Sequence, residues 1–291
     1  MANICDYLRE HGERKISKEA PFSEADQLIL ARFSYLPFPK IKIGAFETIG
    51  SIAKKMSLLA SEDFCWPDDE EYIKLLRHTK RFAKMRVSHF VRNDDKNLEK
   101  QFSAITIHMN FQRAYLSFFG TDSSITGWKE DFLMSCQSET AGAKEAVEYF
   151  NKIAPVLEGE LILGGHSKGG NFAMYAAAFC EAQHKGRILK VYNNDGPGFR
   201  DEVIQSEEFQ EMLPKILTIA PQSSIIGQLL SNPAKQNVIH STAKGILQHD
   251  AMTWEAEKDR LVSSELDEIS HYAKTTLGSW LETMDDESRE P

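Results

Sequence analysis

Apolar side chains recur at helical spacing through the first hundred residues of this chain. The segments 24–34 and 45–59 place them three and four residues apart, which is typical of helices that bury one face. Pro37 and Pro39 lie between the two segments and separate them. We therefore predict a mainly helical N-terminal extension over residues 1–100.

The spacing changes to a strand pattern after residue 101. Two stretches rich in β-branched and aromatic residues flank a short polar turn and indicate a β-hairpin. Helices and strands then alternate, which is the pattern of the βαβ units of a parallel sheet. The expected hairpin strands are 102–109 and 114–119, the helices are 141–154 and about 169–184, and the later strands are 161–164, 188–192, 216–220 and 236–241.

These elements predict an α/β protein with a mostly parallel central sheet flanked by helices. Residues 265–284 space their apolar side chains like a closing amphipathic helix. No internal repeat or low-complexity linker divides the chain, so we expect a single domain over residues 1–291. Within it, the extension 1–100 precedes a catalytic core over 101–262 and a C-terminal helix and tail over 263–291.

Charge and composition exclude several classes of protein. The formal net charge is -9, so no general positive field attracts nucleic acid or an anionic membrane. The four cysteines are far apart and have no histidine at metal-ligand spacing, which argues against disulfides and a zinc site. The N-terminus lacks the apolar core of a signal peptide, and no apolar run approaches the roughly 20 residues of a membrane span. We expect a soluble, cytoplasmic protein with reduced thiols and no nucleic-acid partner.

The segment 161–170, LILGGHSKGG, places Ser167 in a Gly-x-Ser-x-Gly motif between an apolar strand and an alanine-rich helix. This is the context of a nucleophile elbow, in which Gly165 and Gly169 leave room for a tight turn. The backbone N–H of Lys168 would then face the developing oxyanion. The plainer alternative is a glycine-rich turn in which the serine only caps a helix. The strand before the motif and the helix after it favour the hydrolase interpretation.

A serine becomes a nucleophile when a histidine takes its proton and a carboxylate orients that histidine. In this kind of fold the order along the chain is serine, acid, histidine. His249 is the preferred base because it lies in a loop after an expected strand. His240, at the end of that strand, is the reserve. His184 and His271 fall in or beside helices, where a surface position is expected.

The acid is assigned to Asp195, which directly follows the strand after the elbow helix. Catalytic groups gather at the carboxyl ends of parallel strands. The alternative role of Asp195 is to bond its own backbone in an Asp-Gly turn. Asp250 is the other candidate acid, although a residue next to His249 in sequence rarely points at its ring.

An oxyanion hole needs a second donor, from the loop after an earlier strand. Gly120 and Thr121 follow the second hairpin strand and fit that position. Gly120 would allow the backbone to approach the substrate, and Thr121 could offer its N–H and its hydroxyl. An ordinary loop that caps the next turn is the simpler alternative.

Five ordered segments resemble a bacterial family of unassigned function called Mbeg1-like: SFFGTDSSITGWKEDF, LILGGHSKGGNFAMYAA, VYNNDGPGF, PQSSIIGQLL and GILQHDAMTW. That family is similar to the α/β-hydrolases related to class 3 lipases, and the similarity spans most of the chain. The resemblance implies an α/β-hydrolase fold, with Ser167 as nucleophile, His249 as base and Thr121 as oxyanion residue.

Three positions depart from the class 3 lipase pattern. Phe119 stands where those lipases usually have arginine, and Lys168 where they commonly have leucine. The loop in which their acid tends to lie reads PQSS here and has no carboxylate. Asp195 is placed more as in pancreatic-type lipases, which is why it is preferred as the acid.

The leading hypothesis is hydrolysis of a carboxylic ester, of a lipid or a small molecule, through an acyl-enzyme on Ser167. An acyltransferase or thioesterase would use the same residues, with Lys168 attracting an anionic acceptor. A catalytically silent hydrolase fold that serves as a binding protein is the third hypothesis. No metal or organic cofactor is implied, and the sequence does not indicate an oligomeric state. Residues 60–100 could supply a lid, although packed helices are the simpler interpretation.

Overall fold

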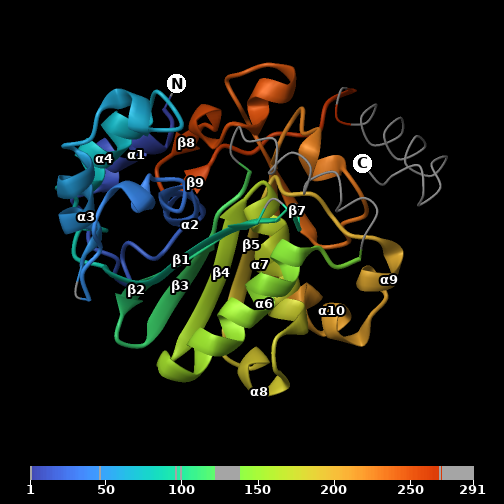
Figure 1. Cartoon of the computed structure of the whole chain (residues 1–291). Coiled ribbons are helices and arrows are strands. Elements are labelled where there is room, and N and C mark those ends of the chain that lie inside the picture. Colours follow the sequence, from blue (N-terminus) through green and yellow to red (C-terminus); the bar gives the residue numbers. More distant parts are fainter. Residues whose placement is uncertain are drawn as a thin grey trace.

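A computed structural model describes residues 2–45, 47–95, 97–98, 100–121, 138–268 and 270. A seven-stranded sheet crosses its centre with the strands in chain order (Figure 1). The first three strands pair antiparallel, and the pairs from β3 to β7 are parallel. The strands are β1 (Arg86–Asp95), β2 (Lys100–Asn110), β3 (Arg113–Phe118), β4 (Glu160–His166), β5 (Ile188–Asn194), β6 (Ile216–Pro221) and β7 (Lys235–Ile239).

Two helices, α6 (Ala141–Ile153) and α7 (Lys168–Phe179), cover one face of this sheet (Figure 1). Thr140 caps α6 by accepting a hydrogen bond from the Ala143 amide. Most of α7 is small and apolar, so the helix lies close to β4 and β5 and is almost wholly buried. Three short helices follow along the chain, α8 (Ala182–Lys185), α9 (Asp201–Ile204) and α10 (Glu207–Met212).

Four N-terminal helices pack at the other face and at the β1 edge (Figure 1). Capping boxes at Asn3, Ser23 and Thr48 begin the first three of them. α2 lies directly on β3 and β4, and all of its residues after the first are buried. The four helices are α1 (Ile4–His11), α2 (Glu24–Phe33), α3 (Ile49–Met56) and α4 (Asp69–Leu76).

The architecture is an α/β fold with a mostly parallel central sheet flanked by helices, as expected from the sequence, and the hairpin and the alternating helices and strands are confirmed. The extension differs from the expectation, because its last part forms β1. Within residues 60–100, where a lid was the alternative, α4 packs on α1 and α3 and Phe82 is fully buried, which agrees with the simpler interpretation of packed helices. The closing helix expected over 265–284 lies largely outside the described residues. A small hairpin that was not expected, β8 (Ala256–Glu257) and β9 (Arg260–Leu261), follows the central sheet.

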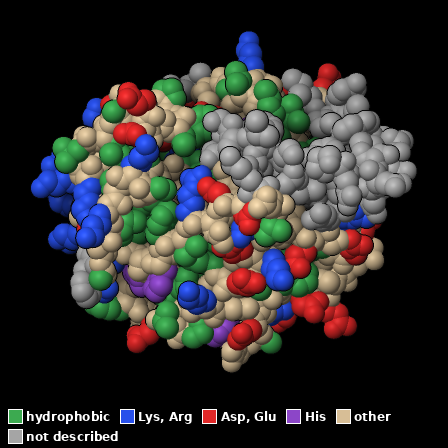
Figure 2. All heavy atoms as spheres, viewed as in Figure 1, with side chains coloured by type: hydrophobic (Ala, Val, Ile, Leu, Met, Phe, Trp, Pro, Cys, Tyr) green, Lys and Arg blue, Asp and Glu red, His purple; other side chains and the backbone are tan. Residues whose placement is uncertain are grey.

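Charge is unevenly distributed over the surface. On the face seen in Figure 2, Lys and Arg side chains gather over the N-terminal helices, and Asp and Glu side chains gather around α9 and α10. Of the described helices, none combines the length and the apolar character needed to cross a bilayer.

Candidate active site

Ser167 occupies a strained turn between the end of β4 and the start of α7. Its backbone has φ 57° and ψ -135°, a conformation that costs a non-glycine residue energy and persists only when neighbouring contacts hold it. The Ser167 amide donates to the carbonyl of Asn194 at the end of β5, over 2.9 Å. The neighbouring strand thus helps to hold the turn that presents the hydroxyl.

The glycines of the motif are required by close backbone packing. A Cβ on Gly165 would lie 2.3 Å from the carbonyl carbon of Gly169 and 2.6 Å from the carbonyl oxygen of Phe118. A Cβ on Gly169 would lie 2.2 Å from that same oxygen. Any side chain would therefore push α7 away from β3, which agrees with the steric reason for the Gly-x-Ser-x-Gly pattern.

Asp195 and His249 are hydrogen-bonded to each other. The Nδ1 atom of His249 lies 2.7 Å from the Oδ2 atom of Asp195, whose side chain is buried. The other oxygen, Oδ1, accepts from the Ser224 hydroxyl. The Asp195 amide donates to the carbonyl of Ile219 in β6 over 2.8 Å, so the residue is fixed through side chain and backbone alike.

The other sequence candidates have different partners. Asp250 accepts from the Met252 amide at 3.0 Å and caps a short 3-10 helix instead of facing the His249 ring. His240 lies 2.8 Å from a carboxylate oxygen of Glu255.

His184 is buried, not at the surface as expected, because its ring packs edge-on against Phe150. His271 lies outside the described residues.

His166 links the elbow to the loop that carries His249. Its Nε2 atom lies 2.7 Å from the backbone carbonyl oxygen of His249, and its Nδ1 atom lies 3.0 Å from the Tyr35 hydroxyl. The two imidazole rings are 4.6 Å apart. Burial holds the pKa of His166 well below its usual range, and the nearby His249 lowers it further. Sequence reasoning missed this role, although the position of a histidine next to Ser167 was a signal.

The segment expected to form the oxyanion hole lies against the elbow. A Cβ on Gly120 would be 3.1 Å from the Cβ of Ser167 and 2.4 Å from the carbonyl oxygen of His166. Thr121 is the next residue, and the 16 residues after it, 122–137, are not described. Lys168 begins α7, where backbone N–H groups have no acceptor within the helix.

The Lys168 side chain is fully buried, with its Nζ atom 5.9 Å from the centre of the Phe172 ring. The sequence suggested that this ammonium group could attract an anionic acceptor. A group inside the protein does not present its charge to a ligand approaching from solvent.

A second unexpected support for the elbow comes from α2. The side-chain amides of Gln27 and Asn194 bond to each other in both directions, over 2.8 and 3.0 Å. The Asn194 amide group also donates to the carbonyl of Gly165 at 2.9 Å. The backbone carbonyl of Asn194 accepts from the Ser167 amide. The N-terminal extension is therefore connected to the turn through the contact of Gln27 with Asn194 and the contact of Asn194 with Ser167.

Two further features of the described part of the chain are the lack of a metal-ligand cluster and the presence of a cavity near Asp195. No three of its His, Cys, Asp and Glu residues are grouped so that they could hold a metal ion. A cavity of about 390 Å³ lies beside β6 and β7 and is lined in part by Thr218 and Gly227. The cavity adjoins Asp195, because a Cβ added to its lining residue Gly227 would be 2.4 Å from Asp195 Oδ1. Neither Ser167 nor His249 lines the cavity.

A family model described as Mbeg1-like matches residues 76–291. No curated protein matches the chain. Among solved structures, it is similar to a mutant form of MDLA from Penicillium cyclopium, at 12% identity and a TM-score of 0.49 over 88% of this chain and 92% of that one. It is also similar to a fungal lipase in complex with an inhibitor, at 14% identity and a TM-score of 0.43 over 59% of this chain and 70% of that one. For Rhizomucor miehei lipase in complex with its propeptide, the identity is 14% and the TM-score 0.41 over 54% of this chain, and the match spans only 57% of that lipase.

Proposed function

This chain belongs to the Mbeg1-like family, and we propose that it is a serine hydrolase that cleaves a carboxylic ester through an acyl-enzyme on Ser167. The observation that carries the proposal is the 2.7 Å hydrogen bond between His249 and Asp195. The His249 ring lies 4.6 Å from the ring of His166, the residue before a serine on a strained strand-to-helix turn. A histidine oriented by a buried carboxylate next to such a serine is the arrangement that activates a hydroxyl for attack.

In this mechanism Ser167 Oγ attacks the ester carbonyl while the Nε2 atom of His249 takes its proton. Asp195 accepts the Nδ1 hydrogen, so the imidazole keeps the tautomer with an unprotonated Nε2. The resulting imidazolium then returns the proton to the leaving alcohol. Water, activated by the same histidine, hydrolyses the acyl-enzyme and regenerates the serine.

We propose that the backbone N–H groups of Lys168 and Thr121 bind the oxyanion that forms in both steps. The close approach of Gly120 to Ser167 supports this assignment, because it brings the segment after β3 next to the nucleophile. Donors fixed in advance of the reaction typically contribute about 3 kcal/mol each to the stability of the transition state.

The alternatives receive less support. An acyltransferase or thioesterase would use the same three residues, but the Lys168 side chain that was expected to attract its anionic acceptor is buried. A silent binding protein would need neither the His249–Asp195 pair nor a serine held in a strained backbone conformation.

The test is labelling of the purified protein with a fluorophosphonate, a reagent that reacts with activated serines. We expect stoichiometric labelling of the wild type and none of Ser167→Ala or His249→Ala. His240→Ala is the matched control, because His240 pairs with Glu255 at another place, and it should label normally. A folded wild type that resists the reagent would overturn the proposal. Turnover of p-nitrophenyl esters of increasing chain length would then define the acyl group.

A further inference from the structure

The protonation of the His166 ring follows from its two hydrogen bonds. A carbonyl oxygen can only accept, so the contact with the His249 carbonyl requires a hydrogen on His166 Nε2. Because burial keeps this imidazole neutral, its Nδ1 atom has no hydrogen and must accept. The donor to Nδ1 is therefore the Tyr35 hydroxyl, whose single hydrogen also faces the His166 carbonyl oxygen at the longer distance of 3.2 Å.

We propose that His166 and Tyr35 are positioning residues that hold the loop bearing His249 against the turn bearing Ser167. Through this contact, the N-terminal extension sets the geometry of the catalytic base. The inference deepens the proposed function and rests on it for its effect on activity, whereas the hydrogen bonds themselves can be tested without any activity.

The loop needs such a contact because of where its short helix ends. Residues Gly245–His249 form a 3-10 helix, and the last carbonyls of a helix have no partner within it. Two aromatic rings supply the missing donors. The indole N–H of Trp254 donates to the carbonyl of Gln248 at 2.7 Å, and His166 Nε2–H donates to the carbonyl of His249. The backbone carbonyls of Gln248 and of His249, the proposed base, are thus both fixed by hydrogen bonds.

Tyr35 is held in place by Phe119, after β3, and by residues of the extension. Its ring lies 4.7 Å from that of Phe119, and the Arg32 guanidinium lies 5.1 Å from the ring centre. Arg32 in turn pairs with Asp69 of α4 over 2.7 Å, and both side chains are buried. The hydroxyl occupies the space beside Gly120, where an added Cβ would lie 2.0 Å from it. A chain of contacts therefore runs from α4 through Arg32 and Tyr35 to the elbow.

The expected effect on catalysis is large because proton transfer depends on the distance between donor and acceptor. A displacement of about 1 Å can lower a rate about 100-fold. We expect His166→Leu to lower kcat about 100-fold with KM changed less than about twofold, since a positioning residue acts on the chemical step rather than on substrate binding. His166→Gln places an amide N–H near the position of Nε2 and should recover at least about tenfold of the loss. Tyr35→Phe, which leaves the Nε2 donor in place, should lower kcat only about threefold to tenfold.

Rates should be expressed per active site, counted by fluorophosphonate titration, so that a loss of folded protein is not mistaken for slower chemistry. Tyr7→Phe is the matched control. The Tyr7 hydroxyl also belongs to the extension and donates to Asp26 at 2.9 Å, without a contact at the elbow. It should keep the wild-type kcat per site. Equal losses in Tyr35→Phe and Tyr7→Phe, or in His166→Gln and His166→Leu, would overturn the inference.

A second measurement separates this inference from the proposed function. In ¹⁵N-histidine NMR of the wild type, His166 should show a protonated Nε2 and an unprotonated Nδ1, and Tyr35→Phe should shift the Nδ1 resonance. The opposite tautomer would contradict the inference even in an active enzyme. If the tautomer is as expected and the wild type does not react with the fluorophosphonate, the proposed function fails and the hydrogen-bonded link stands.

Discussion

The His249 Nδ1 atom lies 2.7 Å from the Asp195 Oδ2 atom, although 54 residues separate them in the chain. The second carboxylate oxygen accepts from Ser224, in the loop that follows β6. That loop therefore contributes a hydroxyl that orients the carboxylate. Both oxygens of Asp195 are engaged, so the direction in which it faces the imidazole is fixed.

Asp195→Asn should nearly abolish turnover without unfolding the protein. The new amide would donate to Nδ1, and His249 would then have its hydrogen on Nε2, where it cannot take the proton of Ser167. We expect kcat to fall about 10³- to 10⁴-fold. Hydrolysis of a p-nitrophenyl ester measures it. Asp250→Asn is the control, because an asparagine can still cap the 3-10 helix, and its kcat should stay within about twofold of the wild type.

Gly120→Ala should destabilise the protein and slow labelling of Ser167. The new Cβ would lie 2.0 Å from the Tyr35 hydroxyl and 2.4 Å from the His166 carbonyl oxygen, and the second of these is backbone that cannot simply rotate away. Overpacking of this kind costs about 1–3 kcal/mol in the free energy of unfolding, measured in urea. Gly186→Ala meets nothing within 4 Å and should be neutral or slightly stabilising. If both variants unfold at the same urea concentration, the packing argument is wrong.

The parts of the site that could be predicted from the sequence are those formed by residues close together in the chain. The strand, the glycines and the helix around Ser167 form one continuous segment, and Asp195 follows the next strand of the same βαβ unit. Tyr35 and Gln27 could not be found in this way, because their contacts with His166 and Asn194 join segments more than a hundred residues apart. In sequence they read as ordinary parts of an amphipathic helix and the turn after it.

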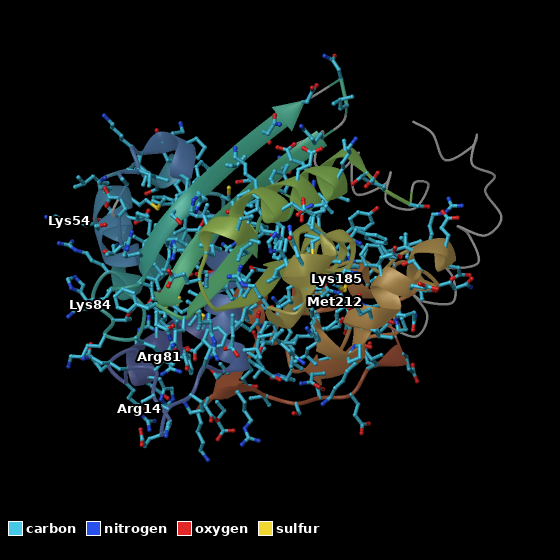
Figure 3. All side chains as sticks on the ribbon, turned by 90° about the horizontal axis from the view of Figure 1, so that it is seen from below. Arg14, Lys54, Arg81, Lys84, Lys185 and Met212 are labelled. Atoms are coloured by element: carbon cyan, nitrogen blue, oxygen red, sulfur yellow. The ribbon has the colours of Figure 1, made fainter. Side chains whose placement is uncertain are left out.

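Removal of Arg81 should cost far more stability than removal of a neighbouring surface charge. The Arg81 guanidinium pairs with Asp26, and both groups are buried. The guanidinium also donates to the carbonyl of Arg14 at 3.0 Å, and both arginines are labelled in Figure 3. Arg81→Met leaves the Asp26 carboxylate buried without its cation and should lower the free energy of unfolding by about 3–5 kcal/mol. Lys80→Met breaks an exposed pair with Glu13 and should lower it by less than about 1 kcal/mol. If the two variants lose the same free energy of unfolding in thermal or urea melts, burial does not strengthen the Arg81–Asp26 pair.

The buried, neutral His166 predicts a loss of stability in mild acid. Its pKa is lowered by folding, so between the ordinary histidine pKa of about 6.5 and the lower folded value the unfolded chain binds a proton that the folded protein does not. Stability should therefore fall as the pH falls through this range, by at most about 1.4 kcal/mol per pH unit from this group. His166→Gln should show a shallower slope than the wild type in urea melts from pH 7.5 to 5. Parallel slopes would mean that His166 is not neutral when folded.

Strand β1 was missed by sequence analysis for a different reason. It is an edge strand, and along Arg86–Asp95 most side chains are at least partly exposed, so the alternation of apolar and polar residues is weak. A bulge between Ser88 and Val91 breaks the alternation further. The interior strands β4 and β6 are buried on both faces and read as apolar runs, which is why they were recognised.

The position of α2 on the sheet has a consequence for how the chain can be shortened. A protein beginning at residue 76, where the family match begins, would lack α2 and the helices around it. Ile105, Ile107 and Ile162, which pack under these helices, would then face water as one apolar surface. We expect such a fragment to aggregate when expressed alone. The stretch of sequence by which the family is identified is thus shorter than the stretch that has to fold together.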